Sequence, residues 1–177
     1  SYGFLPGDYV RDKDSVGAIC MIAEVAAWAK DQGKTLYQLL KDIYIEYGFS
    51  QERLISIVRK GKAGADEIKA MMQDFRSNPP ATLGGSKVCL IKDYSTLKAS
   101  NPLTGKSEQL DFPATSDVLQ FFTEDGSKVS VRPSGTEPKI KFYFEVKTDM
   151  AAREDFEAAA QTGNEKIDHI VADLKLN

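Results

Sequence analysis

A run of residue types suited to anion binding stands between two strand-like segments in the stretch VSVRPSGTEPKIKFYFEV, residues 129–146. Ser134 and Thr136 offer hydroxyl donors. Gly135 between them allows a positive φ, which lets adjacent backbone N–H groups converge on an anion. Arg132 offers a planar fork of donors that matches phosphate oxygens, and a proline at each end stiffens the turn. These features predict a phosphate-binding turn.

Side chains alternate between two faces along the strand that follows the turn. The apolar set, which we expect in the core, is Ile140, Phe142 and Phe144. The opposite set, which we expect on the side of a bound ligand, is Lys139, Lys141 and Tyr143. The alternative interpretation is a stiff hairpin turn whose charges are only solvated. A P-loop is excluded, because the pattern Gly-x-x-x-x-Gly-Lys is absent.

Hydrophobic periodicity and turn residues predict the elements that position this turn. The expected helices are residues 14–32, a segment with a Thr35–Gln38 capping box that ends at Gly48, residues 64–77 and residues 149–174. The expected strands are residues 53–61, 86–94, 117–123, 128–133 and 139–146, with a hairpin turn at 124–127 and a loop at 95–116. The pattern changes near Ser50, which predicts a mostly helical segment, 1–49, and an α+β domain, 50–177.

Composition restricts the environment and the partners. The net charge of −3 argues against broad binding to nucleic acid or to anionic lipid. The longest apolar run, residues 16–29 with Trp28, is too short for a membrane span and predicts a buried helix. Cys20 and Cys89 both stand in apolar runs, which predicts buried thiols and a reducing, cytoplasmic location.

Two motifs carry a resemblance to a known family. The stretch RPSGTEPKIKFYF, from Arg132, closely resembles the C-terminal phosphate-binding loop of the α-D-phosphohexomutases, the phosphoglucomutase/phosphomannomutase family. The opening SYGFLPGDYVRDKDSVGA is similar to the end of that family's third domain. The order and spacing of both motifs fit the family across essentially the whole chain. The resemblance implies a TATA-binding-protein-like α+β domain 4 at 50–177, after a helical remnant of sugar-binding domain 3 at 1–49.

The resemblance also implies an activity. Family members interconvert hexose 1-phosphate and 6-phosphate through a phosphoserine enzyme, with hexose 1,6-bisphosphate as intermediate and Mg²⁺ held by an Asp-Gly-Asp loop. This chain has no Asp-Gly-Asp sequence and no serine in a recognisable phosphoserine loop. We therefore expect no metal ligands and no catalytic nucleophile in it. The missing N-terminal domains would supply both, and the fragment alone would be inactive.

The family motifs assign roles residue by residue. The phosphate clamp corresponds to Arg132, Ser134, Gly135 and Thr136, with Lys139 and Lys141 as further candidates. The sugar-binding positions correspond to Ser1, Arg11 and Lys13. Among these, Lys13 matches the lysine that faces the reacting phosphate. The resemblance does not choose among glucose, mannose and pentose phosphates as the substrate.

Two other functions remain open at this point. The chain could be a stand-alone, non-catalytic phosphate-binding or anion-binding module. It could also bind nucleic acid, because the family's fourth domain resembles the TATA-binding protein, but the negative net charge disfavours this. His169, the single histidine, is expected on the surface. Three tyrosines at helical spacing are expected to pack rather than to bind a ligand: Tyr37, Tyr44 and Tyr47.

Overall fold

The computed structural model describes residues 3–5, 7–9 and 11–176. The chain divides into two compact units, and it passes between them three times. The first unit holds the residues up to Gly48 together with Met150–Phe156, and the second holds Phe49–Asp149 and the residues from Glu157 onward.

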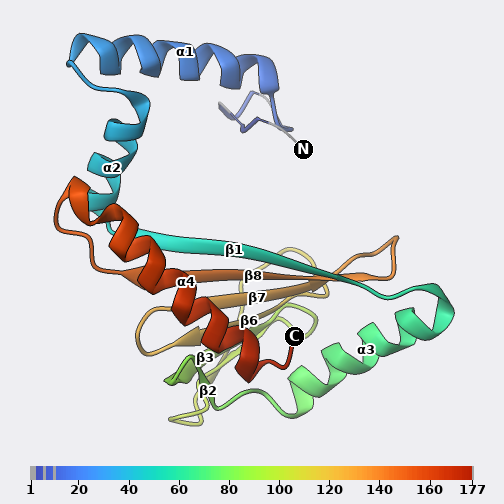
Figure 1. Cartoon of the computed structure of the whole chain (residues 1–177). Coiled ribbons are helices and arrows are strands. Elements are labelled where there is room, and N and C mark those ends of the chain that lie inside the picture. Colours follow the sequence, from blue (N-terminus) through green and yellow to red (C-terminus); the bar gives the residue numbers. More distant parts are fainter. Residues whose placement is uncertain (1–2, 6, 10, 177) are drawn as a thin grey trace. The chain divides into compact units, whose positions relative to one another are not determined.

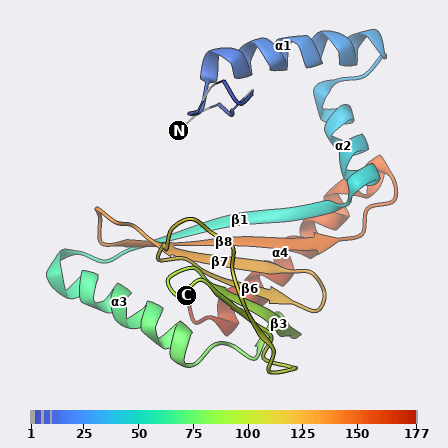
Figure 2. The ribbon, with the colours of Figure 1, turned by 180° about the vertical axis from the view of Figure 1, so that it is seen from behind.

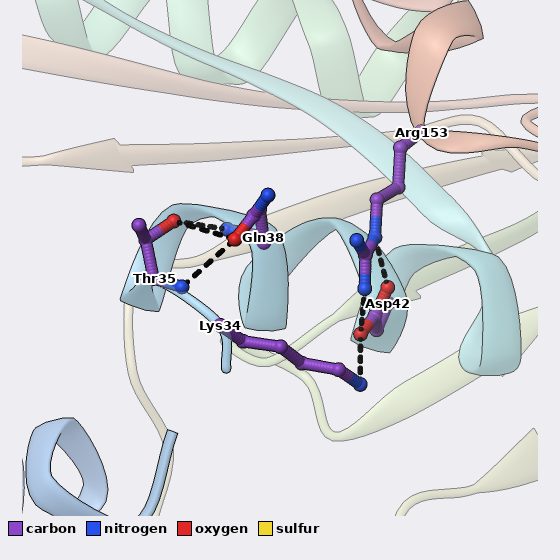
Figure 3. Close-up of polar contacts among 5 residues, drawn as sticks. All are labelled: Lys34, Thr35, Gln38, Asp42 and Arg153. Carbon is purple, nitrogen blue, oxygen red and sulfur yellow. Dashed lines mark hydrogen bonds and ion pairs between the residues drawn. The ribbon is translucent and has the colours of Figure 1, made fainter. Parts of the chain in front are cut away.

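The first unit contains two helices, α1 (Ser15–Asp31) and α2 (Leu36–Tyr47), and a short 3-10 helix, η1 (Arg153–Asp155). Asp14 caps α1, because its carboxylate accepts hydrogen bonds from the first backbone N–H groups of the helix. The predicted capping box of α2 is confirmed. The Gln38 N–H donates to Thr35 Oγ1 at 3.1 Å, and the Thr35 N–H donates to Gln38 Oε1 at 2.9 Å (Figure 3).

The burial expected for the first helix is wrong. Within α1 only Ala29 is buried, whereas Val16 is 71% exposed, Ile19 70% and Trp28 53%. A helix that is apolar on all sides needs neighbours on all sides, and among the described elements of this unit the main neighbour of α1 is α2. Both thiols are free, but neither is buried: Cys20 is exposed and Cys89 is half-buried.

An acidic side chain on α2 fixes the segment that contains η1. Arg153 donates to Asp42 through Nε at 2.5 Å and through Nη2 at 2.6 Å, and Lys34 Nζ donates to the same carboxylate at 2.7 Å (Figure 3). The hydrogen bonds from Arg153 and then from Lys34 hold the pKa of Asp42 well below its usual range. A bidentate guanidinium–carboxylate pair of this kind fixes orientation as well as distance.

Aromatic rings join the same segment to α2. The Phe156 ring stacks on Tyr44 at 6.1 Å and meets the edge of Tyr37 at 5.7 Å. Lys41 Nζ lies 4.5 Å from the centre of the Tyr37 ring and 4.8 Å from that of Phe156. The packing role predicted for Tyr37 and Tyr44 is confirmed, but Tyr47 is 77% exposed and does not share it.

An antiparallel sheet forms the second unit. Its strands are β1 (Phe49–Val58), β2 (Thr82–Leu83), β3 (Ser86–Asp93), β4 (Lys98–Ser100), β5 (Ser107–Gln109), β6 (Leu119–Thr123), β7 (Lys128–Pro133) and β8 (Lys139–Thr148). Their order is β1-β8-β7-β6-β3-β4-β5, with β2 paired to β3. Figure 1 labels the part of this order from β1 to β3. The first strand of the unit therefore pairs with the last, from Phe49 opposite Thr148 to Val58 opposite Lys139.

Two helices, α3 (Gly61–Ser77) and α4 (Phe156–Asp173), cover one face of this sheet. The strands lie behind α4 in Figure 1, and Figure 2 gives the opposite view. The core between helices and sheet includes Ile68, Met72, Val129, Val131, Ile140, Phe142, Phe144, Ile167 and Ile170. The alternation predicted along β8 is confirmed, since Ile140, Phe142 and Phe144 are all buried. The mixed helices and antiparallel sheet agree with the predicted α+β class.

The hairpin between β6 and β7 is confirmed, and its turn is held by Asp125. This carboxylate accepts from Thr123 Oγ1 at 2.6 Å and from the Ser127 N–H at 3.1 Å, and it forms an ion pair with Lys166 of α4. Burial alone would raise the pKa of Asp125. The Lys166 ammonium and the hydrogen bonds of the turn outweigh this effect and hold the pKa well below its usual range.

Other boundaries differ from the sequence expectations. The strand expected from residue 53 begins at Phe49, where β8 provides partners for every residue of β1. The region expected to be a loop, residues 95–116, contains β4 and β5. The last helix begins at Phe156 rather than at 149, after η1. In each case the boundary is set by pairing or packing with residues that are distant in the sequence. Local sequence preferences do not predict such long-range contacts.

Candidate phosphate-binding site

The turn between β7 and β8 is closed by its own backbone. The ladder ends with Pro133 opposite Ile140, and beyond it the Ser134 N–H donates to the Lys139 carbonyl at 2.7 Å. The Lys139 N–H in turn donates to the Glu137 carbonyl at 2.8 Å. The residues Gly135 to Glu137 between these bonds are exposed.

Backbone N–H groups converge in this turn, but not through a left-handed glycine. Ser134 Oγ accepts from the Thr136 N–H at 3.4 Å and from the Glu137 N–H at 3.3 Å. Gly135 does not take a positive φ, and a Cβ at this position would meet nothing within 4 Å. The expected glycine nest is therefore wrong. The serine hydroxyl gathers the two donors instead, as Ser and Thr do in many turns.

A concavity of about 510 Å³ lies beside the turn. The turn forms one side through Pro133, Ser134, Gly135, Thr136, Glu137 and Pro138, and α3 forms the other through Gly61, Lys62, Ala65, Ile68 and Lys69, with Asp117 also in the lining. The beginning of α3 is held close to the turn because the Arg59 N–H donates to the Pro138 carbonyl at 2.9 Å. Size and lining suit a small polar ligand.

None of the three basic residues predicted for the clamp lines this concavity. Arg132 is exposed and lies opposite Lys141 in the β7–β8 register. The neighbours Val131 and Phe142 are buried under the helices, so strand alternation places Arg132 and Lys141 on the other face of the sheet. Neither has an ion pair within the part of the chain that the structure describes. Lys139 Nζ donates to the Glu137 carboxylate at 3.1 Å, so its charge is partly balanced.

The sugar-binding positions belong to the first unit. Ser1 lies outside the described residues. Lys13 Nζ lies 2.6 Å from Asp12 Oδ1, and hydrogen bonds from Lys13 lower the pKa of that carboxyl. Arg11 is exposed and forms no ion pair with the residues that are described. His169 of α4 is exposed, as expected.

Sequence reasoning missed Lys62 and Lys69 of α3, which line the same concavity as the turn. Their spacing of seven residues, about two helical turns, places both on one face of the helix. This spacing in the sequence could have indicated a basic face on α3. Asp117 also lines the concavity, but its carboxylate accepts from Arg76 Nη2 at 2.5 Å. The same guanidinium reaches Asp93 through Nε at 3.3 Å, so Arg76 holds two carboxylates at this edge.

A second concavity, of about 440 Å³, lies over the strands on the opposite side of the sheet from α3 and α4. Its polar groups bind one another. Lys128 pairs with Glu145, and Gln120 accepts from Tyr94 Oη at 3.0 Å and donates to Ser130 Oγ at 2.9 Å. These groups are already satisfied, so the concavity beside the turn is the better candidate for an anion.

The described residues contain neither a cluster of metal-ligating side chains nor a helix that could cross a membrane. No group of three or more His, Cys, Asp or Glu side chains comes together there as a metal site would require. None of the helices that are described has the length and hydropathy needed to cross a membrane.

Comparisons with known proteins agree on one family. The family model "Phosphoglucomutase/phosphomannomutase, C-terminal domain" matches residues 58–162, which include α3 and the turn. A phosphoglucomutase of Staphylococcus haemolyticus is 37% identical over 149 residues, which are 84% of this chain and 27% of that protein. A phosphoglucomutase of Staphylococcus aureus is 39% identical over 167 residues, covering 94% of this chain and 29% of that protein.

A solved structure shows the same fold. The open form of parafusin, a phosphoglucomutase from Paramecium, superposes with a TM-score of 0.52 at 19% identity, over 94% of this chain and 29% of that one. The chain therefore spans less than a third of the length of these relatives. Because the family model matches more than half of its residues, the chain belongs to the phosphoglucomutase/phosphomannomutase family and contains the family's C-terminal domain.

Proposed function

We propose that the chain is the C-terminal, phosphosugar-binding part of an enzyme that interconverts hexose 1-phosphate and 6-phosphate. The observation that supports this most directly is the exposed turn at Ser134–Thr136, inside the span of the family match and beside a concavity of about 510 Å³. In this proposal the turn holds the sugar's phosphate group that is not reacting.

The turn has the donors that such a role requires. The hydroxyls of Ser134 and Thr136 and the N–H groups of Thr136 and Glu137 lie together in it. A phosphate oxygen is a stronger acceptor than Ser134 Oγ, so a bound phosphate would take over these N–H bonds. Arg132 and Lys141, exposed or half-buried at the base of the turn, extend the clamp toward the other face of the sheet.

The other functions of the enzyme are assigned to the first segment of this chain and to domains outside it. We assign residues 1–49 to the end of sugar-binding domain 3, with Ser1 and Arg11 near the sugar and Lys13 near the reacting phosphate. Residues 50–177 are domain 4. The phosphoserine and the Mg²⁺ ligands come from preceding domains. The described residues of this chain offer no group that would hold a metal ion. Hexose 1,6-bisphosphate is the proposed intermediate, and the proposed location is the cytoplasm.

The test is coupled mutase kinetics on the complete enzyme that contains this chain. Arg132→Ala should lower kcat/KM by about 10- to 150-fold, the equivalent of one charge-assisted hydrogen bond of roughly 1.5–3 kcal/mol. The matched control is Lys87→Ala, an exposed lysine of β3 beside the hairpin at 124–127, at the opposite end of β7 from the turn. Equal kcat/KM for both variants would contradict the clamp. Mutase turnover by the 177-residue chain alone would contradict the assignment of catalysis to other segments.

A further inference from the structure

Two cations of α3 face the turn across its concavity. Lys62 and Lys69 both line the space that Ser134, Gly135 and Thr136 line from the other side. The two lysines are separated by about two helical turns, so they lie along one stripe of α3. Both side chains are exposed, and the helix is fixed beneath them because Ile68 and Met72 are buried in the core. The concavity thus has hydroxyls and N–H groups on one side and ammonium groups on the other.

The charge balance of the concavity leaves these two lysines unpaired. Its carboxylates are already engaged elsewhere: Glu137 by Lys139 and Asp117 by Arg76. Neither Lys62 nor Lys69 forms an ion pair with any residue in the described part of the chain. The lining itself is neutral, with Lys62 and Lys69 against Asp117 and Glu137, but cations outside the lining engage both carboxylates, so two ammonium groups remain unpaired beside the turn.

A phosphate ester needs that charge. At pH 7 it bears about −1.5 to −2 charges, and hydroxyl and amide donors do not neutralise them. The cation inside the turn, Lys139, is held by Glu137, while Arg132 lies on the other face of the sheet. We propose that Lys62 and Lys69 form the second half of the phosphate site and that they select a phosphorylated sugar over a neutral one. This inference rests on the proposed function of the turn.

The test is an NMR titration of the 177-residue chain with glucose 6-phosphate at low ionic strength. The amide signals of Gly135 and Thr136 report binding at the turn itself. For Lys62→Gln and for Lys69→Gln we expect the Kd to rise about 3- to 10-fold each, since an exposed charge is partly screened by solvent. The matched control Lys87→Gln should leave the Kd unchanged. Lys62→Arg, which keeps the charge, should retain most of the affinity.

The outcomes separate this inference from the proposed function. Titration with glucose, which has no phosphate, should shift none of these signals in any variant. Binding of glucose 6-phosphate with one common Kd for wild type, Lys62→Gln and Lys69→Gln would overturn the role of the lysines and leave the turn as the site. If the Gly135 and Thr136 signals of the wild type do not respond to glucose 6-phosphate, both the turn and the lysines lose their roles. Dispersed spectra of each variant verify the fold.

Discussion

Replacement of Gly163 by alanine tests how closely α4 packs on the sheet. Gly163 is buried in the helix where α4 crosses β1 and β8. A Cβ added there would lie 2.4 Å from Cβ of Gln51 and 3.6 Å from Cγ2 of Thr148. Non-bonded carbon atoms normally approach no closer than about 3.5 Å. The Gln51 Cβ is bonded directly to the backbone, so no side-chain rotation removes the overlap. The helix must move away from the strand by about 1 Å.

Two opposing effects set the magnitude. Alanine is a better helix former than glycine by about 1 kcal/mol. Displacement of α4 disturbs the packing of Ile167 and Ile170, which have no exposed surface, and overpacking of this kind costs about 1–3 kcal/mol. We expect the upper end of that range, because the overlap involves two atoms fixed to the backbone. The net loss in the free energy of unfolding is then about 2 kcal/mol, or about 4–8 °C in Tm.

Thermal unfolding followed by circular dichroism measures this loss. The matched control is Thr162→Ala, the preceding residue of the same helix, which is exposed. It should change Tm little or raise it, because it gains helix propensity without a new contact. A Gly163→Ala variant as stable as the wild type would show that α4 is free to move relative to β1, and the reasoning from the close approach would fail.

Two carboxylates give further predictions. The pKa of Asp125 is lowered in the folded chain, so its ionised carboxylate stabilises the fold above about pH 4, the pKa of an aspartate in the unfolded chain. This stabilisation is lost as the pH falls further. The difference in free energy of unfolding between wild type and Asp125→Asn should therefore shrink from pH 7 to pH 3 in urea denaturation, and a constant difference would refute this. Asp42→Asn should speed hydrogen exchange in residues 150–156, because Arg153 loses its carboxylate partner. Exchange equal to that of Asp31→Asn, an exposed control in α1, would count against this role.

The sequence predicted correctly those features of the fold that depend on interactions between residues close together in the chain. The Thr35–Gln38 capping box, the hairpin before Lys128 and the alternation along β8 each depend on residues within a few positions of one another. The turn at Ser134 was also found from its own residue types. Glycine permits a left-handed conformation but does not require it, so residue type alone did not fix the geometry of Gly135.

Long-range relations explain what was missed. The role proposed for Lys62 and Lys69 depends on the pairing of β1 with β8, which places the beginning of α3 beside the turn. The residues near either lysine in the sequence do not predict the pairing of β1 with β8. The exposure of α1 has a similar cause: an apolar sequence predicts a need for neighbours, and burial depends on which neighbours are present. Strand alternation could have predicted that Arg132 lies on the face of the sheet opposite the core, since its neighbour Val131 is apolar.

The pairing of β1 with β8 also orders events during synthesis. In the sheet order β1 stands at one edge with β8 as its neighbour, and Val58 pairs with Lys139 across the intervening residues 59–138. A ribosome adds these residues in roughly 4 to 16 s. During that interval β1 has emerged as an unpaired edge, with apolar residues and open hydrogen-bonding groups, which favours association between nascent chains. Pairing with β8 satisfies one side of β1, and β8 is also the strand that completes the turn, so the turn and this pairing arise in the same step.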